Sequence, residues 1–334
     1  MRNSAVSWVL DFGYQSVMVL AAQEKKSGEW VVLGKGEARA EGFERNEIKK
    51  MTDVVESIVE AIKKAEQSSG NSCHEFYYTV DDCQMNSIKP RGAKILAGEG
   101  QIRREDVKEA TRNALRSISD FEKKAVYSRQ ISYVIDDKDL VGNPVGVFGH
   151  RLDVVLHVLL ARSLYLDEWK KMTKRAGFDR AYPVVSFVSA FHAVLDKNEP
   201  AKIVWDLGKD VCSGGVVDKH CLRDYAVFLN DSGPVQSLAK KVEEISRDWA
   251  REHSIEEPWV VTGDLAEKVE NELEFAAVGT PKNFSFLEQP QYASLLGLLR
   301  IASEAQKAGA GAQTNQHLIR RVKEKANSIL QEYF

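Results

Sequence analysis

Two short segments far apart in the sequence repeat one pattern, in which apolar residues lead to an aspartate and then to a glycine. They are Val9-Leu10-Asp11-Phe12-Gly13 and Val204-Trp205-Asp206-Leu207-Gly208. Each predicts a buried strand that ends in a turn, where the glycine lets backbone N–H groups come close to an anion. One such segment alone would more often be an ordinary strand and turn. The repetition favours a duplicated α/β architecture in which two hairpins face each other and clamp a phosphate.

A third predicted strand, residues 258–262, enters a glycine in the same way and completes a set of candidate nucleotide contacts. The candidate binding residues are Asp11, Gly13, Ser16, Asp206, Gly208, Thr262 and Gly263. The two aspartates are of the type that holds Mg²⁺ through water beside a nucleotide. No Asp or His stands in a context typical of a general base, so we predict no catalytic residue and no metal site.

The charges of the 334-residue chain nearly cancel. There are 46 basic and 49 acidic residues, a net charge of -3. No overall field therefore draws the chain to nucleic acid or to an anionic membrane, and any such attraction must be local. The four cysteines include no Cys-x-x-Cys pair, which favours reduced thiols in a cytoplasm.

The order of predicted elements divides the chain into two lobes and a small inserted domain. Residues 1–81 and 168–200 form the first lobe, and residues 201–305 form a second, reduced lobe. Between the two parts of the first lobe, residues 82–167 follow the order strand, helix, strand, strand, which is typical of a small α+β insertion. His157 lies within an apolar strand of this insertion, and we expect it to be structural rather than catalytic.

The last residues predict a tethered amphipathic helix. Residues 306–317 are rich in Gly and Ala and predict a flexible linker. Residues 318–334 place apolar side chains on one helical face and mainly basic ones on the other, a pattern typical of a helix lying in a membrane interface. A helix docked on the protein's own core is the alternative. The predicted membrane-binding residues are Leu318, Ile319, Val322, Ile329, Leu330, Tyr333 and Phe334.

These features together resemble FtsA, the actin-like bacterial division protein that ties FtsZ filaments to the inner membrane. The most specific segment is GNPVGVFGHRLD, residues 142–153, which is similar to the family's NPxGMxGxRLE motif in its inserted domain. The strand before Gly263 and the terminal segment IRRVKEKANSILQEYF are also similar to family motifs. Because the 142–153 motif matches best, we expect a partner surface that includes Asn143, Pro144, His150 and Arg151.

The resemblance implies an actin-like fold, a duplicated relative of the ribonuclease H fold, with an inserted α+β domain and a C-terminal amphipathic helix. It also implies a peripheral position on the cytoplasmic face of the inner membrane. The implied partners are the membrane surface, FtsZ or other division proteins, and further copies of the chain, with no nucleic acid among them.

The resemblance is weakest where ATP would bind. The family's DIGGGTTD becomes DLGKDVCS, residues 206–213, so that Asp210 places a carboxylate where the terminal phosphates belong. Asp264 follows Gly263 where the family has glycine. Only 56 residues separate Asp206 from Gly263, so we expect the family's further subdomain over the nucleotide to be largely absent. The sequence therefore predicts a division scaffold with a degenerate cleft and weak or absent ATPase activity, with ATP and magnesium as its only candidate cofactors.

Three other interpretations stay open. An active actin-like ATPase would use the retained Asp11 and Asp206. A pilus-assembly adaptor of the PilM type would share the core and the insertion and bind a partner's peptide, but would not need the amphipathic tail. A sugar or acetate kinase of the same superfamily would need a general base and an acceptor pocket.

Overall fold

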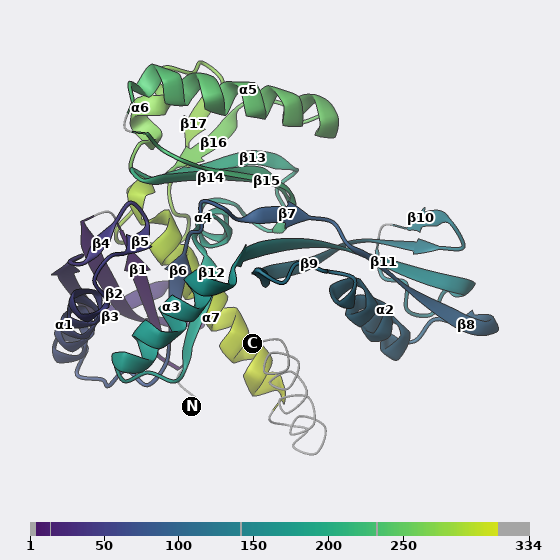
Figure 1. Cartoon of the computed structure of the whole chain (residues 1–334), viewed down its shortest axis with the longest axis horizontal. Helices are drawn as coiled ribbons and strands as arrows, with labels where there is room; N and C mark the ends of the chain where they lie inside the picture. Colours follow the sequence, from purple (N-terminus) through teal and green to yellow (C-terminus); the bar gives the residue numbers. More distant parts are fainter. Residues whose placement is uncertain (1–4, 14, 141, 232, 313–334) are drawn as a thin grey trace.

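Two five-stranded sheets with the same strand order form the body of the molecule (Figure 1). The computed structural model describes residues 5–13, 15–140, 142–231 and 233–312. In each sheet three antiparallel strands are followed by two parallel ones, so the order β3-β2-β1-β6-β12 of the first lobe returns as β15-β14-β13-β16-β17 in the second. This repetition confirms the predicted duplication.

The first lobe combines its sheet with four helices. Its strands are β1 (Ser7–Phe12), β2 (Ser16–Glu24), β3 (Trp30–Arg39), β6 (Phe76–Val80) and β12 (Ala181–Val185), with a two-stranded ribbon of β4 (Phe43–Glu44) and β5 (Glu47–Ile48). Its helices are α1 (Met51–Ser69), α3 (Ser163–Arg175), α4 (Ser186–Val194) and α7 (Ala293–Ala312). Helix α1 lies close on β3 because Gly36 has no side chain, since a Cβ there would lie 1.9 Å from the Ala61 carbonyl oxygen.

The second lobe is smaller, and its helices α5 and α6 lie on the same side of its sheet (Figure 1). Its elements are β13 (Lys202–Leu207), β14 (Val211–Asp218), β15 (Cys221–Leu229), α5 (Val235–His253), β16 (Trp259–Thr262), α6 (Ala266–Glu270), β17 (Ala276–Val278) and the 3₁₀ turn η1 (Pro290–Tyr292). Strand β15 connects to α5 through residues 230–234, and the described residues of this connection contain no helix or strand. This short connection agrees with the expected loss of a subdomain.

The inserted domain projects from the first lobe as a sheet that α2 covers on one face (Figure 1). Its elements are β7 (Asn86–Ile88), β8 (Arg91–Gln101), α2 (Arg104–Arg116), β9 (Lys123–Ile135), β10 (Lys138–Leu140) and β11 (Phe148–Arg162). The Asp82 carboxylate accepts hydrogen bonds from the Arg162 backbone N–H and Nε at 2.7 and 2.9 Å, which joins the two ends of the insertion. The chain therefore re-enters the first lobe at Ser163, slightly before the predicted boundary at 167.

Helix α7 crosses the first lobe and packs against α4. It continues through Ala312, so the stretch predicted as linker from Gln306 is helical up to that residue. Lys307 pairs with Glu24 at 2.7 Å, and the Gln306 side chain bonds Ser7 at 3.4 Å. These contacts, with the high helix propensity of alanine, extend the helix. In the described part of the chain, each helix is too short or too polar to span a bilayer.

Candidate functional site

The two Asp-x-Gly hairpins meet at a small cleft between the lobes. Five of the seven predicted contacts line it, namely Asp11, Gly13, Asp206, Gly208 and Gly263. Ser16 and Thr262 do not line this cleft. Thr262 is fully buried, and its hydroxyl donates a hydrogen bond to the Pro290 carbonyl oxygen at 2.9 Å, so it is committed to the core.

The two hairpin glycines use their amides within the turns themselves. The Gly13 N–H donates to the Ser16 carbonyl oxygen at 2.9 Å, and the Gly208 N–H donates to the Val211 carbonyl oxygen at 3.1 Å. A phosphate bound at the hairpins would have to find other donors, because these two amides already have acceptors.

Gly263 allows β13 and β16 of the second lobe to lie close together at the third corner of the cleft. It has a φ of 92°, and a Cβ there would lie 2.7 Å from Asp206 Oδ1 and 2.7 Å from the Leu207 nitrogen. Its own N–H donates to the Pro290 carbonyl oxygen at 3.1 Å. The glycine therefore serves packing between β13 and β16, whose strands pair in parallel.

Carboxylates dominate the floor of the cleft. Asp11 accepts a hydrogen bond from the Thr79 hydroxyl, and Asp206 accepts one from the Ser186 hydroxyl at 2.9 Å. Burial raises the pKa of Asp11, and burial raises the pKa of Asp206 to about 7, because an ionised carboxylate loses its hydration there. At neutral pH the Asp206 side chain is therefore protonated in a substantial fraction of the molecules.

A third acid of the cleft, Asp81, was missed by the sequence analysis. It follows the parallel strand β6 beside Asp11, and its Oδ1 has no hydrogen-bond partner among the described residues. Burial and then the nearby Asp206 and Asp11 hold its pKa well above the ordinary value. The only sequence signal was the position of Asp81 directly after a predicted strand, where parallel strands gather their ends.

The charge of this cleft disfavours a bound nucleoside triphosphate. The volume of the cleft is about 90 Å³, and a pocket of about 720 Å³ that shares Phe43 and Asp210 with it lies alongside, so charge rather than size opposes the nucleotide. Asp210 and Asp264 also line the cleft. A polyphosphate entering the cleft would meet five aspartates, and like charges repel strongly where water is scarce.

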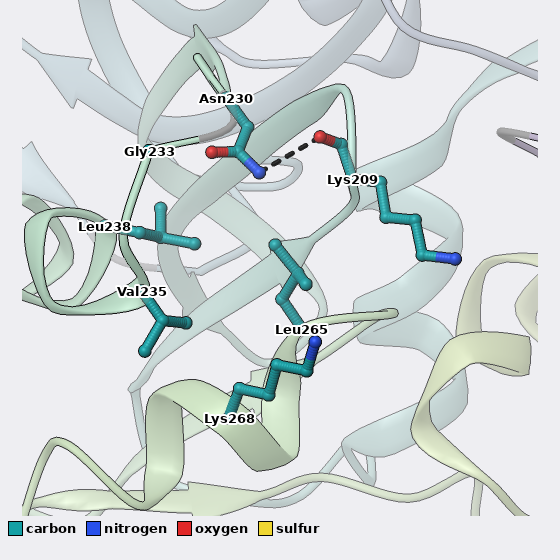
Figure 2. A pocket seen from close by; sticks show the side chains of 7 residues that line it. All are labelled: Lys209, Asn230, Gly233, Val235, Leu238, Leu265 and Lys268. Atoms are coloured by element: carbon teal, nitrogen blue, oxygen red, sulfur yellow. Dashed lines mark hydrogen bonds between the residues drawn. The ribbon is translucent and has the colours of Figure 1, made fainter.

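A larger pocket of about 420 Å³ lies on the second lobe, next to the second hairpin (Figure 2). Its floor is apolar, from Val235, Leu238 and Leu265, and the Lys268 side chain reaches over Leu265. The Asn230 amide donates to the Lys209 carbonyl oxygen at 3.0 Å and closes one side. None of the seven predicted contacts lines it, so it is separate from the clamp between the hairpins.

The predicted partner surface is corrected at one position. Pro144 is buried, because residues 142–147 fold back on the end of β8, where the Gly146 N–H donates to the Ile102 carbonyl oxygen at 2.9 Å. Asn143 is exposed, and its side chain accepts the Val145 N–H at 3.1 Å, which shapes the turn. The motif is therefore partly a structural turn.

His150 and Arg151 remain at the surface of the inserted domain, as predicted. Arg151 makes two hydrogen bonds to Asp153, at 2.8 and 3.0 Å. Several large apolar side chains of the same domain were not predicted as surface residues, among them Phe121 with 97%, Ile95 with 76% and Phe148 with 60% exposure. Phe148 lies within the motif at residues 142–153, whereas Ile95 belongs to no motif that the sequence analysis recognised.

The remaining predicted residues divide into two groups. His157 is buried and bonds Ser87 Oγ at 2.6 Å and the Leu222 carbonyl oxygen at 2.7 Å, which confirms a structural role. The predicted membrane-binding residues all lie outside the described residues. They are Leu318, Ile319, Val322, Ile329, Leu330, Tyr333 and Phe334.

Comparison with known proteins identifies the insertion and the fold. Residues 83–160 match the family model of the SHS2 domain inserted in FtsA. The chain is 21% identical to the cell division protein FtsA of Pseudomonas aeruginosa over 221 residues, 66% of this chain and 53% of that protein. It is 23% identical to FtsA of Neisseria meningitidis serogroup B over 224 residues, 66% and 51% of the two chains. It thus spans about half the length of the curated relatives it matches.

Among solved structures, a chain of the PilM-PilN type IV pilus biogenesis complex aligns with a TM-score of 0.56 at 15% identity. The alignment covers 89% of this chain and 98% of that one. At this identity the likeness concerns the fold alone. With the duplicated sheets and the SHS2 match, it confirms the actin-like fold with an FtsA-type insertion.

Proposed function

We propose that this FtsA-like chain is a peripheral scaffold of the bacterial division machinery that works without ATP hydrolysis. The FtsA-type inserted domain and the similarity to FtsA over about two thirds of the chain support the division role. The scaffold would sit on the cytoplasmic face of the inner membrane and connect division proteins to it.

The observation that carries the proposal is the acid-lined cleft. Its volume is about 90 Å³, and the buried Asp11, Asp81 and Asp206 all have raised pKa values. These side chains are stable together only when some of them are protonated or when a cation neutralises them. A cleft in this state supports closed lobes as a rigid unit better than it supports a cycle of nucleotide binding and hydrolysis.

Attachment to the membrane would come from residues 318–334. The apolar face of that predicted helix would bury in the headgroup region while Arg320, Arg321, Lys323 and Lys325 meet anionic lipids. Burial of several such side chains at roughly 25 cal/mol per Å² gives reversible rather than permanent binding.

Partner binding would rest on the inserted domain, where His150 and Arg151 lie beside the exposed Phe148. FtsZ or another division protein is the expected partner, and contact between copies of this chain is a second use of the same domain. Pull-down of FtsZ by the whole chain and by Arg151→Glu checks this assignment, since unchanged capture by the variant would exclude Arg151.

Calorimetric titration of Mg-ATP into the whole chain tests the central part of the proposal. We expect no binding below millimolar concentration, because the hairpin amides are occupied and the cleft is acidic. A micromolar Kd, or hydrolysis that disappears in Asp11→Asn, would instead establish an active actin-like ATPase.

A PilM-like adaptor in pilus assembly is the second candidate. It is favoured by the fold match over 98% of the PilM chain, although 15% identity carries no function. A fluorescent fusion separates the two candidates in cells, because the division scaffold must gather at midcell septa. Location at pilus machinery with no septal signal would support the adaptor.

A further inference from the structure

Three side chains that can hold a metal ion converge where the second lobe meets the inserted domain. Asp224 lies in β15, and Glu252 and His253 are the last two residues of α5. One ligand atom from each, two carboxylate oxygens and an imidazole nitrogen, lie within 4.8 Å of one another. Two distant segments of the second lobe therefore bring a mixed nitrogen and oxygen donor set together.

The centre of this cluster already holds a positive charge. Asp224 Oδ1 accepts an ion pair from Lys89 Nζ at 2.9 Å, and Asp224 Oδ2 is hydrogen-bonded to His253 Nε2. The side chains of Asp224 and His253 are only 20% and 23% exposed. The carboxylate is thus partly withdrawn from water and is paired with an ammonium from the other domain, so the position accommodates a positive charge.

Glu252 adds a second carboxylate to this cluster. It is exposed, and among the described residues it has no ion pair or hydrogen bond. The neighbouring arginines in the sequence have other partners: Arg223 bonds Asp218 at 2.8 Å and the Ile131 carbonyl oxygen at 2.7 Å, and Arg251 pairs with Asp248. Asp224 therefore has the lysine ammonium, while the Glu252 carboxylate next to it is left without a cation among the described residues.

We propose that Asp224, Glu252 and His253 bind a divalent transition-metal ion of the zinc type. One imidazole with two carboxylates suits Zn²⁺, whose sites with three protein ligands keep a water at the fourth position. Ca²⁺ and Mg²⁺ prefer six or more oxygen ligands, so they fit this donor set poorly. His253 would give up its hydrogen bond to Asp224 and bind the ion with Nε2.

The metal ion and Lys89 compete for Asp224. Lys89 lies between β7 and β8, where the inserted domain leaves the first lobe. Once Asp224 ligates the ion, the ammonium is repelled and the ion pair from the second lobe to the inserted domain opens. The contacts Arg223–Ile131 and Tyr127–Leu222 remain, so the domain loses one of its ties to β15 without being released.

Calorimetric titration of ZnCl₂ into the whole chain at pH 7.5 tests the proposal. We expect one ion per chain with a Kd in the micromolar range, at least tenfold weaker binding by Glu252→Gln and His253→Ala, and severalfold tighter binding by Lys89→Ala. His150→Ala is the matched control, because His150 also faces a single carboxylate, Asp136 at 3.5 Å, and its loss should leave the affinity unchanged.

Equal affinity of the parent, Glu252→Gln and His253→Ala would overturn the site, as would the absence of binding by the parent. Unchanged affinity of Lys89→Ala would overturn the competition. Glu252 is exposed, so its glutamine variant keeps the fold and the test stays decisive if His253→Ala unfolds. The outcome is independent of membrane attachment and of ATP binding.

Discussion

Replacing Asp206 with asparagine should make the folded chain more stable at neutral and alkaline pH. Asparagine has the same shape, and its side-chain oxygen can keep the hydrogen bond from Ser186, which is 2.9 Å long in the parent. The variant therefore removes an ionisable group from the buried floor of the cleft and changes little else. An enzyme that needed this carboxylate would lose function, whereas a closed scaffold should gain stability.

The size of the gain follows from the pKa of Asp206, which burial raises from 3.8 to about 7. Between these two values the folded chain holds a proton that the unfolded chain has released, so stability falls as the pH rises through this window. Relative to the fully protonated side chain, ionisation of Asp206 lowers the free energy of unfolding by at most about 4 kcal/mol at pH 8 and about 2 kcal/mol at pH 5. Because the side chain keeps some contact with water at the cleft, we expect a gain of about 2 kcal/mol at pH 8 and less than about 1 kcal/mol at pH 5.

Urea unfolding of the parent and of Asp206→Asn at pH 5 and pH 8 measures this gain. Asp231→Asn is the control, because Asp231 is an exposed acid of the same lobe and its replacement should change stability equally little at both pH values. A variant that is less stable than the parent at pH 8, or a gain that is the same at both pH values, would refute the assignment of a buried, repelled carboxylate.

Three further outcomes are expected. Gly297→Ala should destabilise the fold by more than about 2 kcal/mol, because a Cβ there would lie 1.7 Å from the Ser189 carbonyl oxygen, where α7 packs on α4. Gly100→Ala is the control and should be tolerated, since the nearest atom to its Cβ would be 3.7 Å away. Equal urea midpoints of the two variants would contradict this packing. Burial lowers the pKa of His192 to about 3, so the unfolded chain binds this proton below pH 6.5 while the folded chain does not, and acid should cost about 1.4 kcal/mol per pH unit. His192→Gln should reduce the slope of stability against pH between 6 and 4, and an unchanged slope would count against a buried neutral imidazole. Arg162→Ala should destabilise the attachment of the inserted domain to the first lobe, because it removes the guanidinium that neutralises the buried Asp82. Backbone amides of β9 and β11 should then exchange hydrogen faster than in the parent. Unchanged exchange would contradict a stabilising role of this ion pair.

Much of the fold could be predicted because its signals are local. The two Asp-x-Gly segments located a central strand of each lobe, because the same pattern occurs twice in the chain. The motif at residues 142–153 identified the insertion, because it is similar to the motif of the FtsA inserted domain.

Other features depend on tertiary contacts that a sequence does not display. The end of α7 was missed because its Gly-Ala stretch reads as a linker, whereas Lys307 is held by Glu24 from the far end of the chain. The burial of Pro144 depends on how its turn folds onto β8. Asp81 entered the cleft only through parallel pairing of β6 with β1, and the small volume of the cleft depends on how closely both lobes pack.

Co-sedimentation with anionic phospholipid vesicles, with and without Mg-ATP, tests the central claim most directly. The whole chain should pellet to the same extent under both conditions, while a chain that ends at Gln316 should stay in the supernatant. Pelleting of the shortened chain, or pelleting of the whole chain only when ATP is present, would contradict an ATP-independent scaffold held to the membrane by its last residues.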